Sequence, residues 1–294
     1  MDLFYSDSYT LAEYAFDTTR KARWIAESLR AQPIANVTFV EPAPATEAQL
    51  LTAHDAAYIQ AVKTGEPRYL AESQGFEWDP QLWPMVCAST GGAIAAARSA
   101  MRDGVAGSLS SGLHHARRGH GAGFCTFNGL AIAAHDALER GARSVLILDL
   151  DAHCGGGTHS LLGEHPQIRL ADVAVSAYDQ YTPEGDNRFE FVRDAAQYLS
   201  TTERLLSEIE RADGYDLCLY NAGMDPYEGC STGGLAGVTQ AALRERERLV
   251  FAWLRRHARA TAFVLAGGYV SRRLTQDELI ALHRLTIEAA SAVA

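Results

Sequence analysis

The chain has 294 residues, of which 47% are hydrophobic, and its formal net charge is −10 at pH 7. This composition is that of a folded, acidic protein and excludes a disordered or collagen-like chain, while the acidic balance argues against nucleic acid as a direct partner. No run of about 18 apolar residues predicts a membrane span and the first ten residues lack signal-peptide features, so we expect a cytoplasmic protein.

Short β-branched runs alternate with longer helical patterns along the chain. Strands are predicted at residues 37–40, 105–110, 144–151, 168–177, 216–221 and 261–265. Helices are predicted at residues 11–29, 91–101, 128–139, 192–211, 238–257 and 277–292. This alternation is typical of βα units and a parallel sheet. In such a sheet, ligands bind beyond the carboxyl ends of the strands, and chemistry is therefore sought there.

The predicted strand at 144–151 ends in a group of polar residues. Asp149, Asp151 and His153 follow one another at a spacing of two and would project to one side. Asp-x-His supplies one oxygen and one nitrogen ligand, a pairing that suits Zn²⁺ or Fe²⁺. A capping Asp with a packed His is the simpler interpretation of such a pair alone. Two unpaired carboxylates at the end of an apolar strand would be costly, however, and a cation resolves that cost.

Asp225 follows another predicted apolar strand, at 216–221. By itself it could be a turn residue, because it precedes Pro226. As a third ligand it would complete a site with three protein ligands and one open position. That open position distinguishes catalytic from structural zinc.

Two further segments carry candidate proton donors and acceptors. His114 and His115 lie in a glycine-rich loop after the strand at 105–110. A polar surface loop is the simpler interpretation of such a pair, although imidazoles are the usual proton-transfer groups near pH 7. Tyr269 follows two glycines after the strand at 261–265. A buried tyrosine usually only packs, but beside a metal its hydroxyl could donate to an oxyanion.

Taken in order, these segments resemble the zinc-dependent histone deacetylase family. The matching motifs are LHHARRGHGAGFC, DLDAHCGGG, NAGMDP and GGY, and the segments YNAGMDPYEG, GGLAG and GGYVSRRL are most similar to the class IV branch. The resemblance implies the arginase/deacetylase fold: a three-layer αβα single domain over residues 1–294, with a central mostly parallel sheet. It also implies a hydrolase that removes an acyl group, acetyl or longer, from the N-acyl-lysine of a protein or peptide.

The resemblance implies two cation sites. Zn²⁺, or alternatively Fe²⁺, would be bound by Asp151, His153 and Asp225. A structural K⁺ would lie beside the metal strand, with Asp149, Asp151, His153 and Ser176 as its neighbours.

The remaining roles follow from the same motifs. His114 and His115 would transfer protons, Tyr269 would polarise the carbonyl, and Asp149 would hold His114. The substrate would be contacted by three residues: Gly123 through the carbonyl that positions the attacking water, Phe124 in the acyl tunnel, and Asp79 at the rim.

This chain departs from the family's pattern just after His153. The family commonly has His-Gly-Asp or His-Gly-Asn where this chain has Cys154, Gly155 and Gly156. Gly156 has no side chain to support His115. We therefore expect either reduced activity or a substitute residue from elsewhere in the chain.

Three other functions stay open. An arginase-like ureohydrolase would bind a second metal through additional carboxylates, but Gly155 stands at one of those positions. An acetylpolyamine deacetylase would share the catalytic residues and would need an acidic gatekeeper near Glu228, where Ser231 and Thr232 lie. A weakly active acyl-lysine-binding protein is compatible with Gly156.

Overall fold

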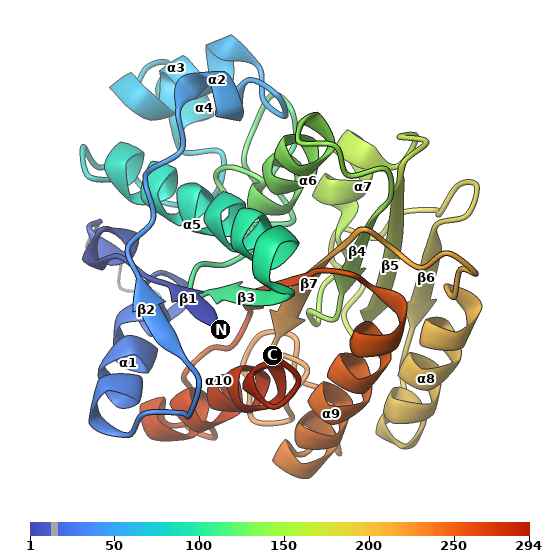
Figure 1. The fold of residues 1–294 in the computed structure, drawn as a ribbon. Helices are drawn as coiled ribbons and strands as arrows, with labels where there is room; N and C mark the ends of the chain where they lie inside the picture. Colours follow the sequence, from blue (N-terminus) through green and yellow to red (C-terminus); the bar gives the residue numbers. More distant parts are fainter. Residues whose placement is uncertain (13–16) are drawn as a thin grey trace.

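The computed structural model of the chain describes residues 1–12 and 17–294. Its centre is an eight-stranded sheet in which neighbouring strands pair in parallel. In spatial order the strands are β2 (Thr38–Val40), β1 (Asp2–Phe4), β3 (Val105–Ser108), β8 (Thr261–Ala266), β7 (Leu217–Gly223), β4 (Val145–Asp149), β5 (Ile168–Ala174) and β6 (Arg188–Phe191) (Figure 1). The predicted α/β fold with a parallel central sheet is confirmed.

Helices cover both faces of the sheet and complete three layers (Figure 1). One face carries α5 (Leu82–Asp103), α6 (Gly129–Glu139) and α7 (Gly156–Leu162), with α2 (Glu47–Leu50), α3 (Ala56–Thr64) and α4 (Arg68–Ala71) beyond α5. The other face carries α1 (Asp17–Ala31), α8 (Tyr198–Glu208), α9 (Gln240–His257) and α10 (Gln276–Ser291). Two 3₁₀ helices, η1 (Asp7–Thr10) and η2 (Ala195–Gln197), precede α1 and α8.

Each face of the sheet buries its own apolar cluster, and β4 contributes to both. Leu146 and Leu148 belong to the cluster under α9 and α10, whereas Val145 and Ile147 belong to the cluster under α5 and α6. Successive strand residues point to opposite faces, so a strand covered on both faces is a continuous apolar run. The sequence VLIL therefore has no polar alternation until Asp149 ends the strand.

Several element boundaries differ from the prediction. The strands β1 (DLF) and β6 (RFEF) were not predicted, because neither contains the β-branched residues that marked the other strands. The helix predicted at 91–101 begins earlier, at Leu82. Pro84 does not prevent this start, because it lies in the first helical turn, where its missing N–H costs no hydrogen bond. The helix predicted at 192–211 is shorter and begins at Tyr198. The helix predicted at 11–29 is observed as α1, and residues 13–16 lie outside the described residues.

A buried ion pair on α9 connects this helix to the end of β4, the strand that precedes the predicted metal ligands Asp151 and His153. Arg246 Nε donates to Glu247 Oε1 at 2.8 Å, and both side chains are at most 1% exposed. Arg246 Nη1 also donates to the carbonyl of Leu150 at 3.2 Å, and Tyr220 Oη donates to Glu247 Oε1 at 2.7 Å. Buried charges are tolerated when they are paired and hydrogen-bonded in this way. The pair therefore holds the backbone directly after β4.

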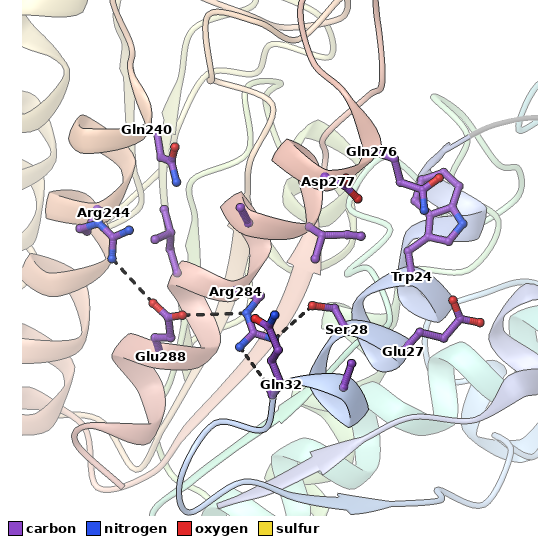
Figure 2. Close-up of a pocket in the computed structure, with 14 residues that line it drawn as sticks. Trp24, Glu27, Ser28, Gln32, Gln240, Arg244, Gln276, Asp277, Arg284 and Glu288 are labelled. Carbon is purple, nitrogen blue, oxygen red and sulfur yellow. Dashed lines mark hydrogen bonds and ion pairs between the residues drawn. The ribbon is translucent and has the colours of Figure 1, made fainter.

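The helices α1, α9 and α10 meet at a polar groove (Figure 2). Arg284 of α10 donates to Ser28 Oγ at 3.2 Å and to the Gln32 carbonyl at 2.9 Å, which ties α10 to α1. Arg244 of α9 lies 3.7 Å from Glu288 of α10. None of the predicted site residues is among the described residues that line this groove.

No helix within residues 1–12 and 17–294 has the length and apolarity needed to cross a membrane. The longest of them is α5, which has 22 residues and packs on the sheet beside α6. The cytoplasmic location stays a prediction.

Replacing Arg246 should destabilise the fold. Arg246→Ala leaves Glu247 as an uncompensated buried charge, so we expect the free energy of unfolding to fall by about 3–5 kcal/mol. Chemical denaturation followed by circular dichroism measures this change. Arg248→Ala is the matched control on the same helix, because the side chains of Arg248 and Glu245 are largely exposed. A loss no greater than in the control would contradict a stabilising role for the buried pair.

Candidate metal centre and active site

Loops after five neighbouring strands converge at the carboxyl edge of the sheet. The strands β3, β8, β7, β4 and β5 are adjacent in this order. In the same order, the loops that follow them carry His114 with His115, Tyr269, Asp225, Asp151 with His153, and Asp179. Because the strands are parallel, their carboxyl ends share one edge. Residues that are distant in sequence therefore meet at one site.

The predicted metal ligands form one cluster. One ligand atom from each of Asp151, His153 and Asp225 lies within 4.8 Å of the others, and all three residues are buried. His153 Nδ1 is 3.0 Å from Asp151 Oδ1 and 3.1 Å from Asp225 Oδ2. Ligands at 2.0–2.1 Å around a tetrahedral zinc ion are separated by about 3.3 Å, which is close to these distances. Two oxygens and one nitrogen suit Zn²⁺ or Fe²⁺.

The position of Asp225 depends on close backbone contacts. Its Oδ1 accepts a hydrogen bond from Ala152 N at 2.9 Å, and its buried Oδ2 faces His153 Nδ1 at 3.1 Å. Gly267 packs against it: a Cβ atom there would lie 2.2 Å from Asp225 Cγ, and its φ is +53°. Only glycine tolerates both constraints. Oδ2 is thus held toward His153 as an available ligand.

Without a cation, the cluster holds a proton. Burial disfavours the imidazolium, but hydrogen bonds to Asp151 and Asp225 raise the pKa of His153 to about 11. Burial and the charge of Asp151 raise the pKa of Asp225. The proton occupies the place where positive charge is required, which is also the place where a metal ion fits.

The two adjacent histidines have different environments. His114 Nδ1 lies 2.7 Å from Asp149 Oδ2 and His114 Nε2 lies 3.6 Å from Asp151 Oδ1. Burial opposes its charge, but these two carboxylates raise the pKa of His114 to about 10. Burial and the charge of His114 lower the pKa of His115 to about 4. His115 is therefore the neutral imidazole of the pair at pH 7.

His115 has a carboxylate partner despite Gly156. Asp179, in the loop after β5, places its Oδ2 atom 2.9 Å from His115 Nδ1. Asp179 was not predicted as the residue that would substitute for a side chain at position 156. The sequence shows only that it follows the predicted strand at 168–177, because residue spacing does not reveal the loop conformation that brings it to His115.

A pocket of about 540 Å³ opens above the cluster. It is lined by His115, His153, Tyr269, Gly123 and Phe124 from the prediction, and by Ser73, Gln74, Gly75, Ala122, Ser176, Tyr178, Thr232 and Gly233. Burial raises the pKa of Tyr269 well above its usual value, so its hydroxyl remains protonated at neutral pH. Asp79 is not among the described residues that line this pocket, and its carboxylate accepts a hydrogen bond from Gln81 N at 2.6 Å.

Two more buried charged residues beside the site were missed. Asp172 of β5 accepts a hydrogen bond from Gly155 N at 2.9 Å, and burial with the charge of Asp149 raises its pKa to about 8. Lys21 of α1 is 1% exposed and donates to the Gly267 carbonyl. In the sequence, Asp172 stands out as an acidic residue within an otherwise mostly apolar strand. The sequence does not distinguish Lys21 from an exposed lysine on a helix surface.

Comparisons with known proteins place this geometry in context. A family model described as "Histone deacetylase domain" matches residues 15–190. An uncharacterized protein of Picosynechococcus sp. is 32% identical over 241 residues, which cover 78% of each chain. Histone deacetylase 2 of Arabidopsis thaliana is 26% identical over 313 residues, covering 97% of this chain and 79% of the relative.

A solved structure supports the same fold. The crystal structure of acetylpolyamine aminohydrolase from Burkholderia pseudomallei has a TM-score of 0.79 and 20% sequence identity, and the match covers 100% of this chain and 99% of that one. At this identity the likeness concerns the fold alone. The predicted three-layer architecture is confirmed by it.

Removing a ligand should remove the metal. His153→Ala should lose stoichiometric Zn²⁺ after dialysis, because two carboxylates alone leave the site without its nitrogen donor. His120→Ala is the matched control, since His120 is exposed in the loop that carries His114. Elemental analysis of the dialysed proteins measures the content. Equal metal in both variants would contradict the assigned site.

Metal binding should depend on pH. The pKa of His153 is about 11 without metal, so its imidazole is protonated at pH 7, and only neutral imidazole binds a metal ion. Binding at pH 7 should release at least one proton per ion, and affinity should rise with pH. Calorimetric titration in two buffers of different ionisation enthalpy measures the number of protons. Binding without proton release would contradict the protonated cluster.

Proposed function

Because the chain belongs to the histone deacetylase family, we propose that it hydrolyses the amide of N-acyl-lysine in a protein or peptide. The acyl group would be acetyl or longer. The observation that supports this best is the convergence of His115, His153 and Tyr269 on one pocket of about 540 Å³. A proton acceptor, a candidate metal ligand and a protonated hydroxyl then surround the same substrate atoms.

His115 is the proposed proton-transfer residue. It lies on the pocket wall, and its Nδ1 atom is engaged by Asp179. Nε2 is therefore the atom that takes a proton from the attacking water and later gives it to the leaving amine. His114 lies behind it between Asp149 and Asp151, and burial together with the charge of His114 lowers the pKa of His115 and keeps it neutral before the reaction.

Tyr269 and two residues of the 109–128 loop complete the proposed site. The phenol of Tyr269 donates a hydrogen bond to the oxyanion that develops on the acyl carbonyl. The carbonyl of Gly123 orients the attacking water, and Phe124 forms an apolar wall with Phe76, whose ring centroid is 5.3 Å away. Asp151, His153 and Asp225 would hold a divalent ion, which supplies Lewis-acid polarisation when bound.

The residues that line the pocket favour the neutral side chain of N-acyl-lysine over a polyamine, which carries further cationic amines. Among the described residues that line it there is no Asp or Glu. Glu228, near the expected gatekeeper position, has its carboxylate engaged by Gly237 N at 2.9 Å. A second cationic amine would thus find no counter-charge on the wall, whereas a lysine side chain attached to a peptide needs none.

We also propose that a structural K⁺ binds beside β4. Asp149 and Asp172 face each other across Gly155, since a Cβ atom there would lie 2.9 Å from Asp172 Oδ2 and 3.1 Å from Asp149 Oδ2. Two buried carboxylates this close favour a cation or a shared proton. Asp172 was not among the neighbours expected for K⁺ and adds a third carboxylate to Asp149 and Asp151.

Hydrolysis assays test the function. We expect the protein to release acyl groups from acetyl- or long-acyl-lysine peptides with Zn²⁺ or Fe²⁺, to stop with a chelator, and to recover when metal is restored. Acetylated polyamines serve as the comparison substrates. Turnover of polyamines alone, or peptide binding without any turnover, would contradict the proposal.

Tyr269→Phe should retain the metal and lose most of its activity. Loss of one oxyanion donor typically lowers kcat by about 10²–10³-fold. Steady-state kinetics on the best peptide substrate measure the loss, and metal content measured on the same sample is the control. Near-normal kcat in Tyr269→Phe would exclude the assigned role.

A further inference from the structure

The Nδ1 atom of His115 faces a carboxylate from a separate loop. Asp179 Oδ2 lies 2.9 Å from it, and the two residues are 64 positions apart in sequence. The side chain of Asp179 is 10% exposed. The contact therefore forms only when the loops after β3 and β5 meet in the folded chain.

Gly156 leaves the space that Asp179 fills. A Cβ atom at residue 156 would lie 2.2 Å from the carbonyl oxygen of Asp179 and 2.6 Å from its Oδ1. Atoms in packed interiors do not approach this closely, so any side chain at 156 would displace Asp179. The missing side chain that first suggested an unsupported His115 is thus the condition for its contact with Asp179.

Two further groups hold the carboxylate in one orientation. Gly157 N donates to Asp179 Oδ2 at 3.0 Å, and Arg117 Nη2 donates to Oδ1. Arg117 Nη1 also donates to the carbonyl of Gly156 at 3.2 Å, which fixes the guanidinium beside both residues. Asp179 has a φ of +60°, a left-handed conformation that is uncommon for residues other than glycine but that aspartate tolerates better than most. The three hydrogen bonds from His115, Gly157 and Arg117 hold its carboxylate in place in this conformation.

We propose that Asp179 is the positioning residue for His115, an inference that rests on the function proposed above. Its carboxylate accepts a hydrogen bond from the Nδ1–H group of His115. This bond fixes the tautomer and leaves Nε2 as the atom that exchanges protons with the reactants. The same negative charge stabilises the imidazolium once Nε2 has taken a proton. Arg117 and the Gly157 amide keep the carboxylate aimed at His115.

A clamp between two loops is the simpler role for Asp179, and the two roles predict different losses. Tyr178, its neighbour, lines the pocket, so a released loop would change the KM for substrate and the thermal stability. Loss of a positioning residue instead lowers kcat and changes the tautomer of His115. Both roles can therefore be measured separately.

The kinetic test compares Asp179→Ala and Asp179→Asn with Asp186→Ala. Asp186 is exposed in the same connection between β5 and β6 and is the matched control. We expect kcat to fall about 10–100-fold in both Asp179 variants, with KM within about twofold and the metal content unchanged. Asp179→Asn keeps the size of the side chain and serves if Asp179→Ala does not fold. A kcat within about twofold of the wild-type value would overturn the proposal.

The tautomer of His115 gives a readout that needs no substrate. Nitrogen chemical shifts of isotope-labelled histidine, assigned with His115→Ala, should show an Nδ1–H tautomer in the wild-type protein. That tautomer should lose its predominance in Asp179→Ala and persist in Asp186→Ala. An unchanged tautomer would overturn the positioning role even if the protein is an active hydrolase. If no acyl peptide is hydrolysed, the function fails while this measurement still decides the role of Asp179.

Gly156→Ala provides an independent variant at the other side of the contact. Its Cβ must move Asp179, so we expect the same loss of kcat and of the Nδ1–H tautomer. Gly119→Ala is the control, because a Cβ atom there meets only Asp55 Oδ2 at 3.4 Å. A wild-type kcat in Gly156→Ala would contradict the claim that Asp179 can contact His115 only when residue 156 has no side chain.

Discussion

Two buried carboxylates, Asp151 and Asp225, share a site with one imidazole, and the surrounding structure is arranged to compensate their charge. Backbone N–H groups donate to both, from His153 to Asp151 and from Ala152 to Asp225. Lys21 lies close enough for the two carboxylates to oppose the fall in its pKa that burial causes. Hydrogen bonds alone do not repay the desolvation of two anions, whereas a bound divalent cation would. The need to compensate these two buried charges is therefore the constraint from which the other features of the site follow.

The fold meets this constraint by distributing the site over five adjacent parallel strands. No loop supplies more than part of it, so the relative positions of the strands set the geometry of the cluster. The buried Arg246–Glu247 pair reaches the Leu150 carbonyl, directly before Asp151, from a helix on the far side of that backbone. Rigid elements thus position the ligands, and the loops contribute the pocket wall.

Much of this arrangement could be predicted from the sequence, because strand ends are marked by a change from apolar to polar residues. Asp151, His153 and Asp225 were found in this way, and the resemblance to a family supplied the roles of the histidines and Tyr269. Asp179 could not be found, since its contact depends on the empty space at Gly156 and on a left-handed backbone conformation. The strands β1 and β6 were missed because their sequences, DLF and RFEF, contain no β-branched residue. The class IV branch and the role of Asp79 stay predictions.

We infer from this geometry that one metal ion binds between Asp151, His153 and Asp225. Anomalous diffraction from a crystal grown with Zn²⁺, recorded on both sides of the zinc absorption edge, would locate that ion. We expect a single zinc peak within bonding distance of the three ligand atoms. Zinc elsewhere with this site empty, or two zinc ions bridged by its carboxylates, would contradict it.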